Sequence, residues 1–318
     1  GMPPGKTPGH ITELLDRTYK IGGSDAPDSL HFRQEFMKIA LDRLVAEYNV
    51  TVLFHALLSD VEFGDRRVKS VTLSTVSGNI KVEAPFFIDA TGNADLVALS
   101  GLDFYLGRES DGLCQPLTLN FRLANVDTAR FDKKAANELY KKLQSEGKLR
   151  CPRENILVFK YADDNILHFN TTRYTGIDPT DVFARTRAEI ELREQMLELY
   201  LMLKDNIDGL ENCVLIESGA EAGIRESRRI DALYTLTKED VLSMRKFPDS
   251  IARGTYMIDI HNPSGSGTEC IRLRENDYYT IPYRSLVPRQ ADNLIAAGRC
   301  IGADHVAMSS LRIMPITS

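Results

Sequence analysis

The stretch "APFFIDATGNADLVALSG", residues 84–101, constrains the fold more than any other part of this sequence. Its apolar residues 86–88 predict a buried strand, and a helix-like run over 94–100 follows and stops at Gly101. Between them the strand ends in Ala90-Thr91-Gly92. A strand that ends in a small residue and glycine before a helix is how an α/β sheet brings its backbone close to a nucleotide. The stretch therefore predicts an α/β fold with a ligand-binding turn.

A second unit of the same kind lies near the C-terminus, where "DNLIAAGRCIGADHVA" is an apolar strand that runs into a glycine-containing turn. The sequence between the two units differs in character. Residues 115–126 and 155–172 predict antiparallel strands, and a long helix is predicted to begin near Asp178. This pattern predicts a nucleotide domain made of residues 1–105 and 285–318, with a β-rich α+β substrate domain, residues 106–284, inserted between them.

The N-terminal third carries clear periodic patterns. Apolar residues at spacing four predict an amphipathic helix within residues 29–48. The β-branched run at 50–58 predicts a strand, and residues 66–84 predict a hairpin with its turn at Ser77-Gly78-Asn79.

Composition narrows the class of partner. The net charge of -6 argues against broad nucleic-acid binding and favours a small-molecule substrate. No apolar run approaches the roughly 20 residues of a membrane span, and no secretory signal is recognisable, so no membrane partner is predicted. The five cysteines are far apart without a CxxC pair, and no HExxH or acidic cluster occurs. We therefore predict a cytoplasmic protein with neither a disulfide framework nor a metal site.

The phosphate-binding loop that should accompany such a fold is not found in the sequence. No GxGxxG stands between a strand and a helix, and Gly265-Ser266-Gly267 has Cys270 where the third glycine would be. Neither GxxxxGK[ST] nor a GxSxG nucleophile elbow is present.

Four stretches nevertheless carry a resemblance to a known family. In order along the chain they are "FFIDATGNADLVALSG", "GIRESRRIDALYTLTKEDV", "FPDSIARGTYMIDIHNP" and "IPYRSLVPRQADNLIAAGRCIGADHVAMSSLRIMP". Together they resemble the FAD-dependent oxidoreductase family of glutathione-reductase-like flavoproteins, over almost the whole chain. The resemblance implies FAD as cofactor. It implies that a first motif packs against FAD, with residues Ala90, Thr91 and Gly92. It also implies that a second motif approaches the flavin with its backbone, with residues Gly298, Arg299, Ile301 and Gly302. Residues 57–60 would lie beside the adenine.

The same resemblance implies an incomplete FAD-binding domain, because the family's N-terminal βαβ unit and its C-terminal glycine- and alanine-rich helix lie outside this sequence. Three interpretations stay open. In the first, the chain is a truncated flavoenzyme that acts on a small organic substrate, either anionic or neutral. In the second, it is a non-catalytic binding or oligomerisation module that no longer holds FAD. In the third, it is a fragment whose missing unit is encoded directly upstream. The exposed sheet edge left by the missing strand predicts a homo-oligomer.

Clustered arginines in "RESRR" suggest an anion pocket. If this segment is helical, Arg225 lies on the same face as Arg228 and Arg229, and three guanidinium groups can bind a carboxylate or phosphate. The alternative is a set of ion pairs with the neighbouring carboxylates, Glu226, Asp231 and Glu239.

Two histidines are candidates for proton transfer. Asp259 and His261 alternate along the strand "TYMIDIH" and point to one face, which suggests either an acid–base pair or a hydrogen-bonded histidine at a strand end. His305 follows the second glycine turn directly, so it would lie near the flavin ring if FAD were bound. The predicted catalytic residues are thus His305 and His261 for protons, with Arg228 and Arg229 holding an anionic group.

Overall fold

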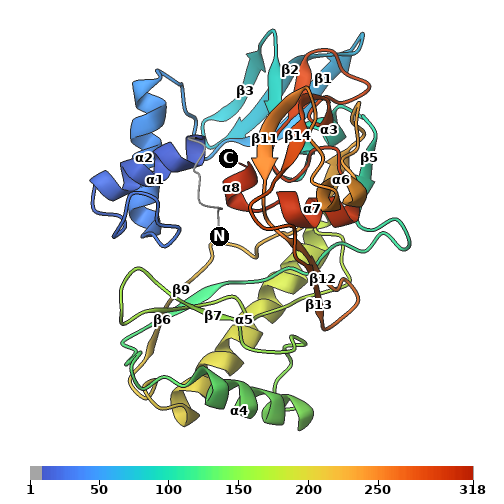
Figure 1. Ribbon diagram of the computed structural model, residues 1–318. Helices are drawn as coiled ribbons and strands as arrows, with labels where there is room; N and C mark the ends of the chain where they lie inside the picture. Colours follow the sequence, from blue (N-terminus) through green and yellow to red (C-terminus); the bar gives the residue numbers. More distant parts are fainter. Residues whose placement is uncertain (1–8, 318) are drawn as a thin grey trace.

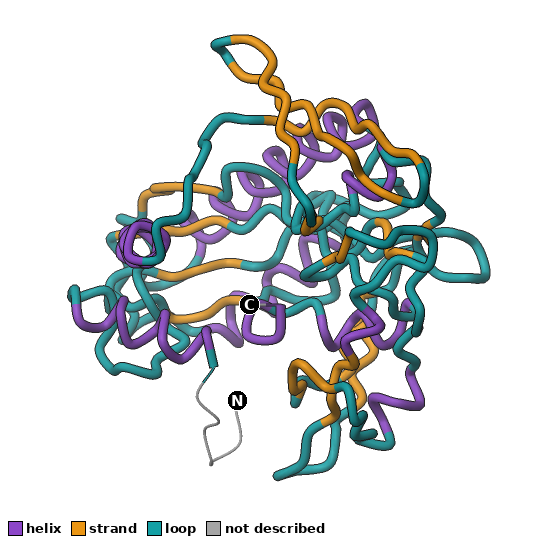
Figure 2. The backbone as a smooth tube through the Cα atoms, turned by 90° about the horizontal axis from the view of Figure 1, so that it is seen from above, coloured by secondary structure: helices purple, strands orange, loops and turns teal. Residues whose placement is uncertain are grey.

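The computed structural model describes residues 9–317, which form a mixed α/β structure. Its strands are gathered in separate small sheets joined by long loops (Figures 1 and 2). At the N-terminus, helices α1 (His10–Lys20) and α2 (Gln34–Glu47) pack against each other. Arg33, just before α2, reaches the loop near residue 163, where its Nη2 donates to Asp163 Oδ1 at 2.7 Å.

The upper part of the molecule in Figure 1 contains the two units that resemble each other in sequence. An antiparallel sheet is formed by β1 (Leu57–Gly64), β2 (Arg67–Thr75) and β3 (Gly78–Glu83). Beside it, β4 (Phe87–Asp89) pairs in parallel with β15 (Leu294–Ala296), and helix α3 (Asp95–Leu99) follows β4. Strand β5 (Phe104–Leu106) pairs with β10 (Arg228–Ile230). Segments from both ends of the chain therefore share one hydrophobic core.

The lower part is a four-stranded antiparallel sheet in the order β7-β8-β6-β9. Its strands are β6 (Phe121–Ala124), β7 (Val158–Lys160), β8 (Leu167–Phe169) and β9 (Val214–Ser218). The sheet packs with α4 (Lys133–Ser145) and α5 (Val182–Asn206) around a core in which Phe121 and Phe169 stack at 4.9 Å between ring centroids. Asp181 caps α5 and accepts from the Phe183 amide at 2.8 Å, so the predicted helix begins slightly later than the sequence suggested.

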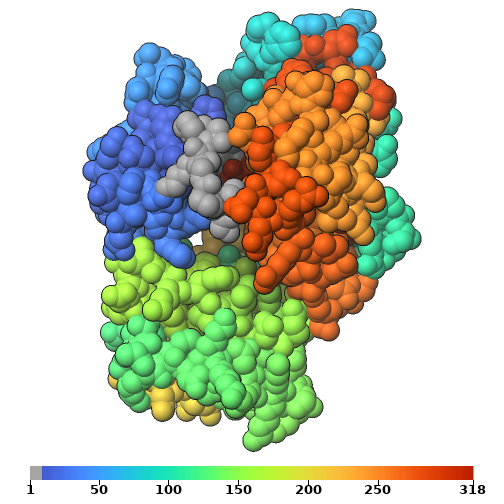
Figure 3. Space-filling view, in the orientation of Figure 1, coloured from blue at the N-terminus to red at the C-terminus, as the bar shows by residue number. Residues whose placement is uncertain are grey.

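A third core is formed by residues of the C-terminal third of the chain. It contains α6 (Lys238–Leu242), β11 (Ser250–Gly254), β14 (Tyr279–Pro282) with the short η1 (Tyr283–Ser285), and the C-terminal helices α7 (His305–Leu311) and α8 (Met314–Thr317). The hairpin of β12 (Ile258–His261) and β13 (Thr268–Ile271) extends from this core toward the lower sheet (Figure 1). In the space-filling view the C-terminal third, orange to red, covers one side of the molecule above the green segments (Figure 3).

One local prediction, the strand over residues 50–58, is wrong in part, since only its last two residues belong to a strand, β1. Residues 50–56 are not a strand, because no partner strand adds to them within the described chain, and their apolar side chains stay exposed, Phe54 by 72%. The helix on which the shared arginine face at "RESRR" was conditional does not form, since residues 228–230 are β10. The helix within 29–48, the hairpin at 67–83, and the strand–turn–helix at 87–99 are confirmed. Within residues 9–317, none of the helices combines the length and the apolarity that a membrane crossing requires.

Candidate functional site

The fold brings the two glycine turns side by side. Strands β4 and β15 are parallel and in register, with Ala296 opposite Asp89, and the Ala297 amide donates to the Asp89 carbonyl at 2.9 Å. Parallel strands end at the same edge of a sheet, so the turns at residues 90–92 and 298–302 leave that edge together. Sequence positions about 200 residues apart thus form one site, as expected of an α/β ligand site.

Asp89 fixes the shape of the first turn. Its carboxylate is 1% exposed and accepts from Thr91 Oγ1 at 2.7 Å, from the Thr91 amide at 3.1 Å and from the Val97 amide at 3.0 Å. Thr91 Oγ1 in turn accepts from the Asp95 amide at 2.9 Å. Side chains thereby satisfy backbone donors that the turn and the start of α3 leave free, which makes the turn rigid.

Arg299 connects the first turn to the second. Its guanidinium lies against Gly92, so a β-carbon at that position would clash with it, and Gly92 also has φ of +76°. Arg299 Nη2 donates to Asn93 Oδ1 at 2.6 Å, whereas the buried Nε has no partner among the described residues. Gly298 has φ of +90° and open space where a side chain would begin. This edge therefore offers bare backbone next to an unused cationic donor.

The other two predicted residues of the second turn lie inside the protein. Ile301 is 4% exposed and packs in the core that contains α7. Gly302 donates its amide to the Ser285 carbonyl at 2.8 Å, and a β-carbon there would clash with Ala232. Their contacts fix the path of the chain after the turn, while Ala90 and Thr91 are on its exposed side.

Glu226 joins two of the predicted site residues in a buried network. This carboxylate is fully buried and accepts from Arg229 Nη1, from the Gln115 amide at 2.9 Å, and lies 2.9 Å from His305 Nδ1. An ionised carboxylate only accepts hydrogen bonds, so Nδ1 of His305 donates to it, and in the neutral ring Nε2 keeps its lone pair. Sequence reasoning treated Glu226 only as an ion-pair partner, because nothing in the local pattern shows that His305 approaches it.

The predicted anion-binding arginines are already paired. Arg229 is 1% exposed and binds Glu226 and the Gly107 carbonyl, the latter at 2.7 Å from Nη2. Arg228 points the other way from β10 and binds Asp95 Oδ1 at 2.9 Å. Arg229 thus pairs with Glu226, one of the carboxylates of the ion-pair alternative, whereas Asp95, the partner of Arg228, was not among them. The role of both arginines toward a substrate stays a prediction.

His261 is 6% exposed and is held from both sides. Its Nδ1 lies 3.1 Å from Arg173 Nη2, which can only donate, so Nδ1 accepts and the ring proton is on Nε2, 3.6 Å from Asp259 Oδ2. Burial lowers the pKa of His261 to about 4, against the raising effect of the Asp259 carboxylate. The neutral ring therefore has its lone pair in use, which is the hydrogen-bonded arrangement that the sequence left open.

Comparison with known proteins identifies the family. The family model for FAD-dependent oxidoreductases matches residues 6–318. The chain belongs to this family. FAD is therefore the cofactor by resemblance, and the predicted relation to flavoproteins is confirmed at the level of the family. No curated protein matches the chain.

Solved structures of distant flavoenzymes are also similar. They include a geranylgeranyl bacteriochlorophyll reductase-like protein from Thermoplasma acidophilum, with 16% identity and a TM-score of 0.37 over 60% of this chain and 41% of that one. Another is p-nitrophenol 4-monooxygenase PnpA from Pseudomonas putida DLL-E4, with 14% identity and a TM-score of 0.37 over 67% of this chain and 47% of that one. A third is L-proline dehydrogenase from P. horikoshii, with 12% identity and a TM-score of 0.36 over 87% of this chain and 52% of that one. This chain spans about half of their lengths or less.

The glycine turns of this FAD-dependent oxidoreductase family member fit a phosphate-bearing cofactor. The unpartnered Nε of Arg299 supplies a donor for an anionic oxygen, and Gly298 leaves room for the cofactor to approach the backbone. Burial lowers the pKa of Arg299, yet a guanidinium keeps its charge at neutral pH. Ala90, Gly92, Gly298 and Arg299 could hold the cofactor at this edge.

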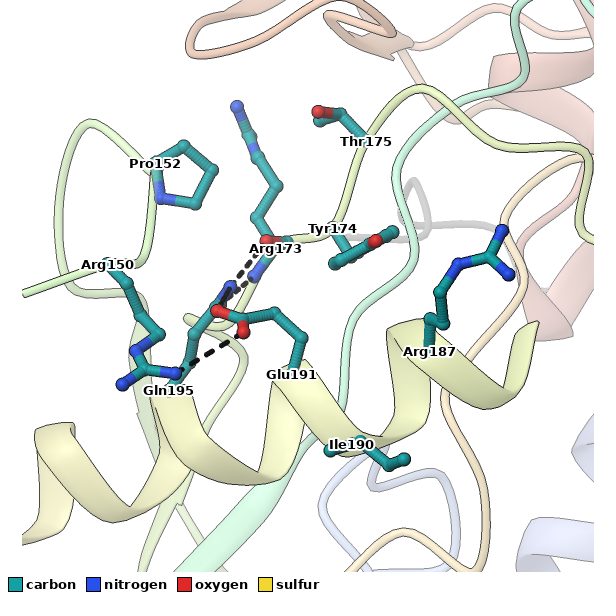
Figure 4. Close-up of a pocket in the computed structure, with 9 residues that line it drawn as sticks. All are labelled: Arg150, Pro152, Arg173, Tyr174, Thr175, Arg187, Ile190, Glu191 and Gln195. Atoms are coloured by element: carbon teal, nitrogen blue, oxygen red, sulfur yellow. Dashed lines mark hydrogen bonds and ion pairs between the residues drawn. The ribbon is translucent and has the colours of Figure 1, made fainter. Parts of the chain in front are cut away.

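A separate cavity of about 460 Å³ lies on α5, away from the glycine turns (Figure 4). Arg150, Arg187 and Glu191 line it, and Arg150 Nη1 is paired with Glu191 Oε2 at 3.4 Å. Arg173 contributes its backbone, whose amide donates to Gln195 Oε1 at 2.9 Å and whose carbonyl accepts from Gln195 Nε2 at 3.1 Å. The side chain of Arg173 runs away from α5. None of the predicted site residues lines this cavity.

Proposed function

We propose that this chain forms the flavin-facing part of an FAD-dependent oxidoreductase that transfers a hydride or an electron pair between FAD and a small organic substrate. The single observation that supports this is the convergence of the two glycine turns at the ends of β4 and β15, with the unused donor of Arg299 between them. When bound, FAD would supply the redox chemistry, and the protein would bind and orient both reactants.

Within this proposal, His305 is the proton-handling residue and Glu226 positions it. The hydrogen bond from Nδ1 to Glu226 fixes the tautomer and leaves Nε2 free to accept a proton from a substrate. His261 and Arg229 would then stabilise the surroundings of the site rather than touch the substrate, because the atoms they would use are bound to Arg173 and to Glu226. Arg228, bound to Asp95 beside the first turn, is the remaining candidate for an anionic group.

The finer classification is also part of the proposal. We propose a glutathione-reductase-like FAD-binding domain, residues 1–105 and 285–318, that is incomplete in this chain, with the substrate domain at 106–284. Consistent with this, β4 and β15 form a two-stranded sheet within the described residues, and Ile88 on β4 is 63% exposed where a complete sheet would be covered. A cytoplasmic location remains part of the proposal.

Reconstitution with FAD tests the function. The purified protein is incubated with excess FAD and desalted, and retained flavin absorbance is measured for the natural sequence, for Arg299→Gln and for Arg289→Gln, which alters an exposed arginine elsewhere. We expect retention that Arg299→Gln weakens and Arg289→Gln leaves unchanged. A colourless protein would favour the alternative, a binding or oligomerisation module without flavin. Retention unaffected by Arg299→Gln would place the flavin elsewhere.

We also propose that the chain self-associates and, in place of the exposed sheet edge on which the sequence-based prediction rested, we assign the contact to the outer face of α5. Phe183, Ile190 and Leu197 recur every seven residues on this helix and are 75%, 57% and 45% exposed. This spacing suits helix-to-helix packing between two copies. Light scattering should show a dimer that Phe183→Lys dissociates, and a monomer across the concentration range would contradict it.

A further inference from the structure

A second group of arginines lies where the β12–β13 hairpin meets the lower sheet. Arg173 Nη2 contacts His261 Nδ1 at 3.1 Å, His261 Nε2 is 3.6 Å from Asp259 Oδ2, and Arg312 Nη2 is also 3.6 Å from that carboxylate. These contacts join α7 to the loop after β8 through the hairpin. The group therefore gathers residues from distant parts of the chain at one buried place.

Arg225 adds a third guanidinium that has only neutral partners. Its Nη1 donates to the Pro116 carbonyl and to Thr118 Oγ1, both at 2.6 Å, and its Nη2 donates to Asn170 Oδ1 at 3.3 Å. Burial, followed by the charges of Arg312 and the other arginines, lowers the pKa of Arg225 well below its usual value. An arginine does not relieve such a position by losing its proton, so the positive charge remains.

Arg153 is the fourth member, because its charge acts on both Arg225 and Arg173, and it is the least satisfied. It is 4% exposed, and its Nε and Nη1 have no hydrogen-bond partner within residues 9–317. Arg312 Nε and the side-chain amide Nε2 of Gln115 are buried without a partner as well. Gln115 adjoins the group because its Oε1 accepts from the His261 amide at 3.4 Å. All four unsatisfied atoms are donors.

The carboxylates within this group do not balance its charge. Glu154 lies 3.3 Å from Arg173 and Asp259 lies 3.6 Å from Arg312, so two carboxylates face four guanidinium groups. His261 is neutral, and the nearby Glu226 is paired with Arg229. A buried excess of about two positive charges is costly unless a counter-charge is present. The unsatisfied donors indicate where that counter-charge belongs.

We propose that Arg153, Arg173, Arg225 and Arg312, with Gln115, form a buried binding site for a small oxyanion that carries two negative charges. A dicarboxylate and a phosphate monoester share this chemistry, since both present several acceptor oxygens to guanidinium donors. Gln115 also donates its backbone amide to Glu226, which positions His305, so the site adjoins the proposed reaction centre. Its use as the anchor of the oxidoreductase substrate rests on the proposed function, whereas anion binding itself does not.

Calorimetric titration of the full chain without flavin tests the site. The protein is titrated with succinate, inorganic phosphate, acetate and chloride at matched ionic strength. We expect saturable binding of one succinate or phosphate per chain, at least tenfold tighter than acetate or chloride. Binding of succinate alone identifies a dicarboxylate site, and binding of phosphate alone identifies a phosphate-ester site. Failure of both to bind would overturn the proposal.

The variant Arg153→Gln separates a binding role from a structural one. It removes one uncompensated cation, so we expect the anion-free protein to melt at a higher temperature while anion binding weakens at least tenfold. The control is Arg150→Gln on the same loop, which is exposed and tied to Glu198 at 2.6 Å, and neither quantity should change. Unchanged binding in Arg153→Gln contradicts the proposal. If that variant does not fold, Arg312→Gln tests the weakening of anion binding alone, because it also breaks the contact with Asp259 and no rise in melting temperature is expected from it.

Flavin retention measured on the same samples keeps the two proposals distinct. Anion binding without retained flavin would leave the site in place and remove its link to the flavin reaction. Retained flavin without anion binding would overturn the site alone.

Discussion

Replacement of Glu226 by glutamine should destabilise the protein more than any change on its surface. Glu226 is fully buried and neutralises Arg229, which is itself 1% exposed. Removing one partner of a buried ion pair costs about 3–5 kcal/mol, because the remaining charge is left without compensation. Glutamine keeps one acceptor oxygen, and the exposed Glu109 lies 3.8 Å from Arg229 Nη2, so the lower end of that range is expected.

Urea denaturation followed by two spectroscopic probes measures this loss, and coincidence of the two curves checks that one transition is observed. Glu221→Gln is the matched control, because Glu221 is 68% exposed in its pair with Arg185 and should contribute at most about 1 kcal/mol. The double variant Glu226→Gln/Arg229→Gln removes both charges. We expect it to lose less stability than the two single variants added together, by about 1–3 kcal/mol. A loss below about 1 kcal/mol for Glu226→Gln, or strict additivity in the double variant, would refute the buried ion pair.

The other predictions concern the turn, the pH dependence and the lower core. In urea denaturation, Gly92→Ala should lower the free energy of unfolding more than Gly112→Ala, by about 1 kcal/mol or more. Both glycines have positive φ, but only at Gly92 does a β-carbon meet Arg299. Equal losses would contradict this close approach. Burial lowers the pKa of His261 and of His168 to about 4 in the folded chain, below the ordinary value of 6.5, so the unfolded chain binds these protons first as the pH falls. Each of these two histidines should lower the stability by about 2 kcal/mol between about pH 7 and 5, so His261→Gln should remove about half of the slope that they share; an unchanged slope would show that His261 does not contribute. Phe121→Ala removes a ring stacked in the lower core and should cost about 3–5 kcal/mol, so a loss near 1 kcal/mol would mean that the core collapses around the gap.

The sequence predicted local structure well where a single segment contains the necessary pattern. The helix at 34–47, the hairpin at 67–83 and the strand before Ala90 depend on spacing and on turn residues within each segment. The prediction failed at 50–56, where β-branched residues favour a strand but a strand also requires a partner. At "RESRR", the helix on which the shared arginine face was conditional is replaced by pairing with β5.

The sequence by itself determined the family and the two glycine turns, because a strand followed by Ala-Thr-Gly or by Gly-Arg-Cys-Ile-Gly can be recognised from neighbouring letters. Only the tertiary structure decided which charged side chains meet. Glu226 reaches His305 across 79 positions, and Arg173 reaches His261 across 88. Such contacts depend on how separate segments pack. In the sequence, an arginine that a carboxylate neutralises, such as Arg229, looks the same as one that has donors buried without a partner among the described residues, such as Arg153.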